Sequence, residues 1–297
     1  MDIASNIYRK MKTKPFVHKL QTQQINKNEL IKALFECYKN NAFSTFPYIS
    51  YGLDSYSSIK NLKSGNCIAL SIFLKKYLLN KNIISYLIPA TIPPYLQKDG
   101  YLDLSHVALA IPSSDKIIYI IDPAFYFLEP IELTEIMSSP SQFKMMDIMS
   151  NNVFNINYSI SRTEDAKIYN KYQSIPKNTF IASCQNSSDS NDHWSYILRE
   201  IVNPENAIGK FFIYIRKQPF IVSTTLENGL CIKNIRVFIH PNNTISIYKR
   251  DDLLYSGPIG TIPHIIIDFL NIELSSHLKY DFQKTLDLTV SKAPPFE

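Results

Sequence analysis

Three residues whose side chains could carry out chemistry together follow one another in the first half of the chain. A cysteine, Cys67, is followed by His106 and then by Asp122, 39 and then 16 positions further along. A thiol beside an imidazole that a carboxylate orients is the arrangement of enzymes that form an acyl-cysteine intermediate. If the fold brings the three together, the sequence predicts a thiol enzyme with Cys67 as nucleophile, His106 as base and Asp122 as the orienting group.

The residues around Cys67 predict that it opens a helix. An apolar run over 68–79 reads as a buried helix, and Gly65-Asn66 supplies the turn that leads into it. The first N–H groups of a helix have no partner within the helix and lie at the positive end of its dipole. Such a position stabilises a thiolate, and the same N–H groups can hold the oxyanion of a tetrahedral intermediate.

A predicted hairpin carries the other two residues. Residues 107–111 and 117–121 alternate as strands around a polar turn at 113–116. The midpoint between His106 and Asp122 is Ser114, inside that turn, so we expect the two side chains to lie directly opposite each other. Ala108 and Ala110 share the face of His106, and these small residues leave room for the helix of Cys67.

Each of the three residues also has a structural interpretation. A free cysteine in an apolar segment is commonly part of a core, and an aspartate before a proline commonly begins a turn. The other cysteines are weaker candidates: Cys37 is predicted on the buried side of a helix, and Cys184 and Cys231 have no base nearby in the sequence. The chain has no CxxC, no metal-ligand spacing of histidines and no glycine-rich phosphate-binding motif, so no metal site is expected.

The composition is that of a globular chain with free thiols. It has 297 residues, 45% of them apolar, and only four cysteines. No apolar run is long enough to span a membrane, so we expect a cytoplasmic protein with no membrane partner. The net charge of +5 arises within residues 1–40, which hold eight basic and three acidic side chains. Charge confined to one segment does not indicate a nucleic-acid groove, and no nucleic-acid partner is expected.

The pattern of elements predicts an α+β protein with three parts. A helical region, 1–82, bears the nucleophile; a β lobe, 83–184, carries the His–Asp hairpin; and a C-terminal β/α lobe spans 194–297. The most polar stretch, 185–193, reads as a loop between the last two parts. The remaining predicted elements are helices at 27–41, 131–138 and 262–270 and strands at 83–90, 211–216, 221–225, 229–239 and 244–249.

The order of a helix-start cysteine, a strand histidine and an aspartate ending the next strand resembles the transglutaminase-like branch of the papain-type cysteine enzymes. Within that branch the chain is most similar to the arylamine N-acetyltransferases. Residues 122–126, Asp-Pro-Ala-Phe-Tyr, resemble that family's Asp-Val-Gly-Phe-Gly motif, and 106–110, His-Val-Ala-Leu-Ala, resemble its histidine strand. The family's Arg-Gly-Gly-x-Cys-x-Glu is Lys-Ser-Gly-Asn-Cys-Ile-Ala at 63–69, which keeps the cysteine and one glycine.

This resemblance implies a helical N-terminal region, an antiparallel β lobe or barrel and a C-terminal α/β lobe. It also implies a cysteine-dependent acyltransferase that forms an acyl-thioester on Cys67 and passes the acyl group to an amine. Its partners would be a small-molecule amine or thioester, with acetyl-CoA or another acyl-CoA as co-substrate and no tightly bound cofactor. Replacement of the motif's glycines by Ala124 and Tyr126 would reshape the acyl-donor channel. Two alternatives stay open: a transglutaminase-like amidase or protease with the same triad, and an inactive binding protein on this fold.

Overall fold

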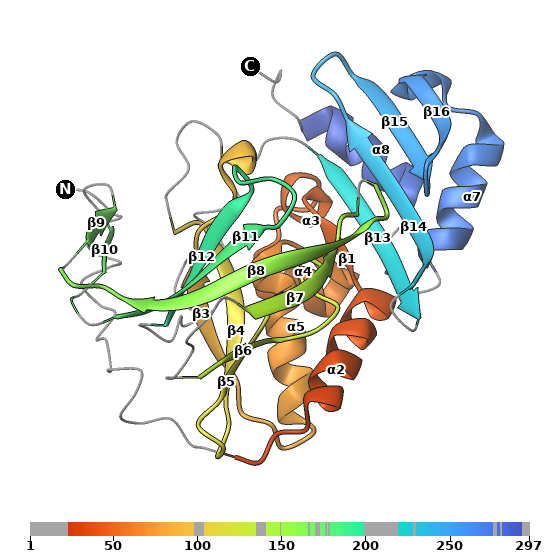
Figure 1. Cartoon of the computed structure of the whole chain (residues 1–297). Coiled ribbons are helices and arrows are strands. Elements are labelled where there is room, and N and C mark those ends of the chain that lie inside the picture. Colours follow the sequence, from red (N-terminus) through yellow and green to blue (C-terminus); the bar gives the residue numbers. More distant parts are fainter. Residues whose placement is uncertain are drawn as a thin grey trace, which may run out of the picture.

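The chain folds into helices and two large sheets that are mostly antiparallel, which confirms the predicted α+β class (Figure 1). The computed structural model describes residues 23–97, 104–134, 141–148, 150–165, 167–169, 173–175, 177, 179–198, 219–227, 230–275, 278–279 and 281–292. None of the described helices is long and apolar enough to cross a membrane.

The N-terminal helices form where the sequence predicts them. Helix α2 (Lys27–Asn40) begins after Asn26, whose side chain accepts the N–H of Asn28, and α5 (Cys67–Leu79) begins after Asn66. The two helices lie side by side, and α5 packs against strand β4 (Figure 1). Two short helices, α3 (Phe46–Ile49) and α4 (Ser55–Leu62), lead the chain towards α5.

An eight-stranded antiparallel sheet forms the β lobe and nearly closes into a barrel. Residues 126–128, between β5 and β6, bridge part of the remaining gap: the N–H of Leu128 donates to the carbonyl of Lys144, and the N–H of Met146 donates to the carbonyl of Tyr126. The strand order is β6-β5-β4-β3-β12-β11-β8-β7. The strands are β3 (Tyr86–Ala90), β4 (His106–Pro112), β5 (Ile118–Ile121), β6 (Ile131–Leu133), β7 (Ser141–Met146), β8 (Val153–Arg162), β11 (Phe180–Asn186) and β12 (His193–Leu198). A small separate hairpin pairs β9 (Lys167–Tyr169) with β10 (Gln173–Ile175).

The predicted hairpin exists as β4 and β5, but its register differs by two residues from the prediction. Leu109 pairs with Ile121, so the hairpin folds about Asp115, and the continued register places Asp122 opposite residue 108. The connection lies one residue further along the chain than predicted: residues 113–117 separate the last pair in place of 112–116, and Lys116 adopts a left-handed φ of 61° within them. A shift of two residues keeps side chains on the same face of a strand, so His106 still shares a face with Asp122.

Two other predicted elements differ from the structure. The predicted helix at 131–138 is wrong where it is described: Ile131 and Leu133 are buried in β6, which pairs with β5, while Glu132 points outward and binds Lys27 at 2.5 Å. This alternation is that of a strand. The predicted loop at 185–193 shrinks to residues 187–192, because its ends belong to β11 and β12. The predicted strand at 211–216 lies outside the described residues.

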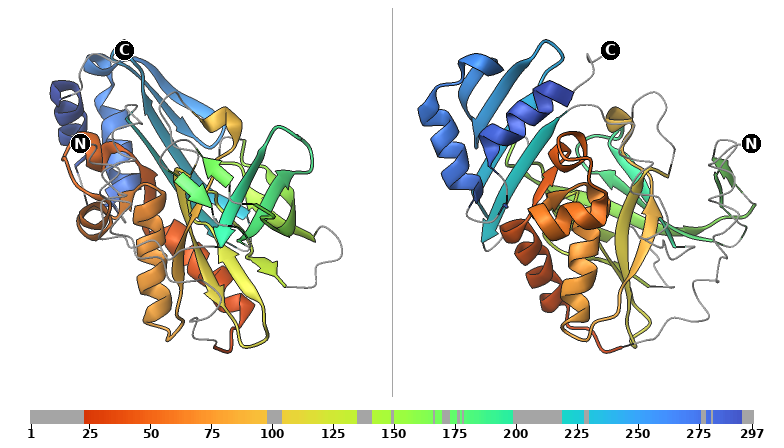
Figure 2. Two further views of the ribbon diagram at one scale, coloured as in Figure 1. Left: turned by 90° about the vertical axis from the view of Figure 1, so that its left-hand side faces the viewer. Right: turned by 180° about the vertical axis from the view of Figure 1, so that it is seen from behind.

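The second large sheet, built mostly from the C-terminal lobe, has the order β16-β15-β14-β13-β1-β2. Helices α7 (His264–Ser275) and α8 (Phe282–Lys292) pack on it through an apolar cluster that includes Val237, Leu270 and Leu286 (Figure 2). The predicted strands at 221–225, 229–239 and 244–249 and the helix at 262–270 are confirmed. The sheet comprises β1 (Ala42–Ser44), β2 (Ser64–Gly65), β13 (Phe220–Glu227), β14 (Leu230–Ile239), β15 (Thr244–Lys249) and β16 (Asp252–Pro258).

Two strands of this sheet, β1 and β2, come from the N-terminal region. Strand β1 pairs with β13 on one side and with β2 on the other, and β2 ends at Gly65, two residues before Cys67. The segment that enters α5 is therefore held by the C-terminal sheet as well as by its own helices. The division of the chain at 1–82, 83–184 and 194–297 stays a prediction.

Candidate active site

Cys67 is the first residue of α5, and the turn before it is held by several hydrogen bonds. The side chain of Asn66 accepts the N–H of Ala69 at 3.1 Å and the hydroxyl of Ser55 at 3.0 Å. The N–H of Asn66 donates to the hydroxyl of Tyr48 at 2.8 Å. Because both its backbone and its side chain are held, Asn66 caps the helix and fixes where the thiol lies. Cys67 itself is 8% exposed.

Gly65 is required at this turn because no space remains for a side chain. A Cβ atom at this position would lie 2.4 Å from Cβ of Ala69 and 2.7 Å from the hydroxyl oxygens of Ser58 and Tyr48. We expect Gly65→Ala to lower the free energy of unfolding by about 1–3 kcal/mol, the usual cost of overpacking, as measured by urea unfolding. Gly260→Ala is the matched control, because a Cβ there meets nothing within 4 Å. Equal stability of the two variants would contradict this account of the turn.

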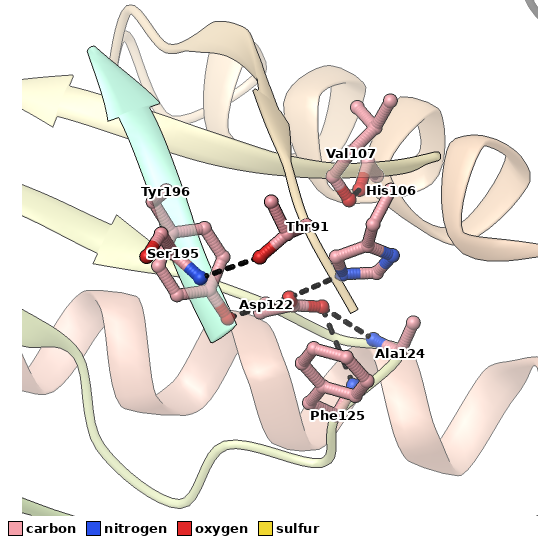
Figure 3. Close-up of polar contacts among 9 residues, drawn as sticks. Thr91, His106, Val107, Asp122, Ala124, Phe125, Ser195 and Tyr196 are labelled. Carbon is pink, nitrogen blue, oxygen red and sulfur yellow. Dashed lines mark hydrogen bonds and ion pairs between the residues drawn. The ribbon is translucent and has the colours of Figure 1, made fainter. Parts of the chain in front are cut away.

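The imidazole of His106 and the carboxylate of Asp122 are in direct contact (Figure 3). Nε2 of His106 lies 2.5 Å from Oδ2 of Asp122, and the two residues are 4% and 0% exposed. The ring of Phe125 packs against the imidazole with 4.5 Å between the ring centroids and a tilt of 32° between the rings. The carboxylate therefore fixes one ring nitrogen, and the aromatic ring limits how the imidazole can turn.

Both oxygens of Asp122 are occupied by hydrogen-bond donors. Oδ1 accepts the N–H groups of Ala124 at 3.0 Å and Phe125 at 3.3 Å, while Oδ2 accepts the hydroxyl of Tyr196 at 2.8 Å as well as His106 (Figure 3). A buried carboxylate is stable only when its oxygens are paired in this way. Four donors hold this one, so its position is set by the turn after β5 and by β12.

The surroundings of His106 raise the pKa of its imidazole and so favour the charged form. Burial lowers the pKa of His106, but the charge of Asp122, the charge of Cys67 and hydrogen bonds to both side chains raise it to about 10. Because Nε2 faces Asp122, the other ring nitrogen is the one available to Cys67. The arrangement can therefore hold a proton on the imidazole, and a cationic group beside the sulfur is what activates a cysteine nucleophile.

Cys67 and His106 line a cavity of about 760 Å³. The cavity has the size of a small-molecule site, and its wall is mostly aromatic and aliphatic. Three carboxylates also line it, those of Asp147, Asp189 and Asp192. A substrate in this cavity would meet the thiol and the imidazole from the same side.

Comparison with known proteins gives matches by structure alone. No model of a known protein family matches the sequence, and no curated protein matches it. Among solved structures, an arylamine N-acetyltransferase from Salmonella typhimurium matches with a TM-score of 0.58 and 10% identity, covering 98% of this chain and 99% of that one. The NAT3 enzyme of Bacillus cereus, described as having a Cys-His-Glu catalytic triad, matches with a TM-score of 0.56 and 13% identity, over 92% and 98%.

A third solved structure, the arylamine N-acetyltransferase of Mycobacterium marinum in complex with CoA, matches with a TM-score of 0.52 and 9% identity, over 99% and 100%. This chain has the arylamine N-acetyltransferase fold. The resemblance predicted from the sequence is thus confirmed at the level of the fold. At these identities the likeness concerns the fold.

The backbone conformation of Tyr126 explains how one departure from the arylamine N-acetyltransferase motif is accommodated. Tyr126 stands where the motif has its second glycine, and its φ of 50° lies in the left-handed region that glycine adopts most easily. The backbone conformation of the glycine is therefore kept although the residue has changed. The tyrosine is buried, its ring stacks on that of Tyr38 with 5.0 Å between centroids, and it lines the cavity.

The arylamine N-acetyltransferase fold also supplies residues that the sequence analysis missed. Tyr196 lies on β12, where it pairs with Ala90 of β3, and Ala90 in turn pairs with His106 of β4. The three residues form one row across the sheet, with only a methyl group between the tyrosine and the histidine. Asp122 bonds to both ends of this row. The pairing of β12 with β3 is long-range, so no local sequence signal could reveal it.

The remaining cysteines do not line the cavity, and the prediction that Cys37 belongs to the core is confirmed. Cys37 and Cys184 are buried, burial raises the pKa of both thiols, and neither lines the cavity. Cys231 is half-buried and donates to the carbonyl of Lys233. All four cysteines lie in the part of the chain that the structure describes, and among them Cys67 is the one that lines the cavity beside His106.

Proposed function

We propose that the protein transfers acyl groups to amines through an acyl-thioester on Cys67. The observation that carries this proposal is the direct contact of Asp122 with His106, together with Cys67 in the wall of the same small-molecule cavity as His106. The arylamine N-acetyltransferase fold supports it, and so does the Cys-His-Glu triad described for the Bacillus cereus enzyme, in which a carboxylate residue also stands third. In this proposal Cys67 is the nucleophile, His106 moves the protons and Asp122 orients His106.

The first half of the reaction would load the acyl group. The sulfur of Cys67 attacks the carbonyl carbon of an activated acyl donor, forming a C–S bond, while the bond from that carbon to the leaving group breaks. The leaving group takes the proton of the His106 imidazolium, which becomes neutral. Asp122 remains ionised throughout and keeps the imidazole in place.

The second half would release the product. A neutral amine attacks the thioester carbon, a C–N bond forms and the C–S bond breaks, so the sulfur leaves as a thiolate. His106 takes one proton from the attacking nitrogen, which restores the imidazolium and the thiolate of the resting state. In both halves the N–H groups of Cys67 and Ile68 have no acceptor within α5 and can hold the oxyanion.

The acyl donor belongs to the class of activated esters and thioesters. The CoA complex of the Mycobacterium marinum enzyme supports acyl-CoA as the donor. The described lining of the cavity, however, includes three carboxylates and no lysine or arginine that could pair with the phosphates of CoA. Comparison of acetyl-CoA with the uncharged ester p-nitrophenyl acetate separates the chemistry at Cys67 from the choice of donor.

Turnover with a simple arylamine tests the proposal. The protein is incubated with either donor and aniline, and acetanilide is measured by mass spectrometry. We expect turnover with at least one donor, abolished by Cys67→Ala and retained by Cys231→Ala, which removes a thiol outside the cavity. Product formation by Cys67→Ala at the wild-type rate would refute the proposal. Absence of acetanilide with release of ammonia from glutamine peptides would instead support the amidase alternative.

A further inference from the structure

One edge of the cavity carries three carboxylates that come from two distant segments. Asp147 follows β7, while Asp189 and Asp192 lie in the 187–192 loop between β11 and β12. The three carboxylates are close enough to one another to change the pKa values of neighbouring groups. Partial burial and the charges of Asp189 and Asp147 raise the pKa of Asp192, and burial with all three carboxylates raises the pKa of Tyr95 to about 12.

No lysine or arginine of the described chain is among the residues that line the cavity, and the His106 imidazolium is already paired with Asp122. Two of the carboxylates accept hydrogen bonds from neutral donors. Asp189 accepts the N–H of Asn191, and Asp192 accepts the side-chain amide of Asn186. The charge of His193 acts on Asp192, but this exposed side chain at the start of β12 lies outside the lining. The acidic edge therefore gives this part of the cavity a negative potential.

A second observation is that two buried polar atoms in the wall lack a partner. Oγ of Ser105, a residue that is 9% exposed, and Oδ1 of Asp192 have no hydrogen-bond partner among the described residues, and both residues line the cavity. Buried polar atoms are normally paired, so these two mark hydrogen-bonding capacity that a ligand would fill. Ser105 directly precedes His106, and Asp192 belongs to the acidic edge. The carboxylates do not form one of the groups that could hold a metal ion in the described part of the chain.

We infer that this cavity selects an acyl acceptor that carries a positive charge apart from its reacting amine. The inference rests on the proposed function and names its substrate class. The neutral amine reaches the acyl group on Cys67, the apolar body lies against aromatic side chains such as Phe154, and the cationic group lies among the carboxylates. The same field disfavours anionic molecules in this cavity, including the phosphate end of CoA.

A series of three arylamines tests the charge preference. Their reacting nitrogens are alike, and their para substituents are anionic in 4-aminobenzoate, neutral in 4-aminobenzyl alcohol and permanently cationic in 4-(trimethylammoniomethyl)aniline. For the wild-type protein we expect kcat/KM to be highest for the cationic acceptor and lowest for the anionic one. The triple variant Asp147→Asn, Asp189→Asn, Asp192→Asn keeps an oxygen acceptor at each position while it removes the charge.

The triple variant is expected to lower kcat/KM for the cationic acceptor on the order of 10-fold, because each partly exposed carboxylate accounts for about 2- to 5-fold. It should change kcat/KM for the neutral acceptor by less than about 2-fold and raise it for the anionic one. Asp252→Asn is the matched control, because Asp252 is an exposed carboxylate of β16 outside the cavity. It should leave the order and the values unchanged.

The test separates the two proposals because acylation is measured first. Wild type and the triple variant are treated with p-nitrophenyl acetate, which has no net charge, and the acetyl group on Cys67 is measured by mass spectrometry. If no acyl-cysteine forms in the wild type, the proposed function fails. If it forms in both proteins but the three acceptors react equally, or the cationic preference survives the triple substitution, the charge selection is overturned and the proposed function stands.

Discussion

Replacement of Asp122 by asparagine is expected to lower kcat/KM for acyl transfer by about 10⁴-fold, the effect of the same change in a serine-protease triad. Asparagine keeps the size of the side chain but removes the charge that raises the pKa of His106. Its amide nitrogen also cannot accept the hydrogen bonds that one of the two carboxylate oxygens now accepts. The imidazole would then lose both its orientation and the group that stabilises its charged form.

A second variant, which weakens the hydrogen bonding of Asp122 but keeps its charge, separates the two contributions of the carboxylate. Tyr196→Phe removes one of the four hydrogen bonds of Asp122 and leaves its charge. A hydrogen bond to a charged group contributes about 1.5–3 kcal/mol, so the loss of activity should be roughly 10- to 100-fold. Both variants are compared by thermal unfolding to show that they fold. Activity of Asp122→Asn within about 10-fold of wild type would contradict the role of Asp122.

His106→Gln is expected to lower the rate at which iodoacetamide alkylates Cys67 by about 100-fold or more at pH 7, the usual scale of general-base assistance. In the wild type the raised pKa of His106 keeps a positive charge beside the sulfur across neutral pH. The alkylation rate should therefore change little between pH 7 and 9, whereas the rate of the variant should rise with pH over the same range. Peptide mapping assigns the label to Cys67, and the half-buried Cys231 provides the internal reference. Equal pH profiles in the two proteins would show that His106 does not act on Cys67.

The same pKa shift predicts the pH dependence of stability. His106 has a pKa raised from 6.5 to about 10 by folding, so the folded protein binds a proton that the unfolded chain releases between these values. This contribution to the free energy of unfolding is fully present below about pH 6.5 and is lost as the pH rises through the folded pKa. Urea unfolding across this pH range measures it, and the part of the wild-type slope that is due to His106 should be missing in His106→Gln.

The sequence was sufficient for the features that depend on neighbouring residues. Gly65-Asn66 before an apolar run predicts a helix that begins at Cys67, because a capping side chain and a tight turn are local properties. The shared face of His106 and Asp122 is also predictable, because side chains alternate along strands. The direct opposition of the two was wrong because the position of the turn, which the sequence defines only to within a residue, sets the register.

The sequence was insufficient for the features that depend on distant pairing. Tyr196 reaches Asp122 because β12 pairs with β3, and nothing near residue 196 indicates this partner. The acidic edge likewise joins Asp147 to Asp192 across two hairpins of the barrel. Such contacts follow from the closure of the sheet, which no local pattern encodes.

The most direct test of the central claim is to trap the acyl-enzyme. The protein is mixed with p-nitrophenyl acetate, quenched in acid within one turnover and digested, and the peptides are mapped by mass spectrometry. Our account predicts one acetyl group on the peptide that contains Cys67, and its disappearance when an arylamine is added before the quench. Acetylation elsewhere, or an acetyl group on Cys67 that the amine does not remove, would contradict it.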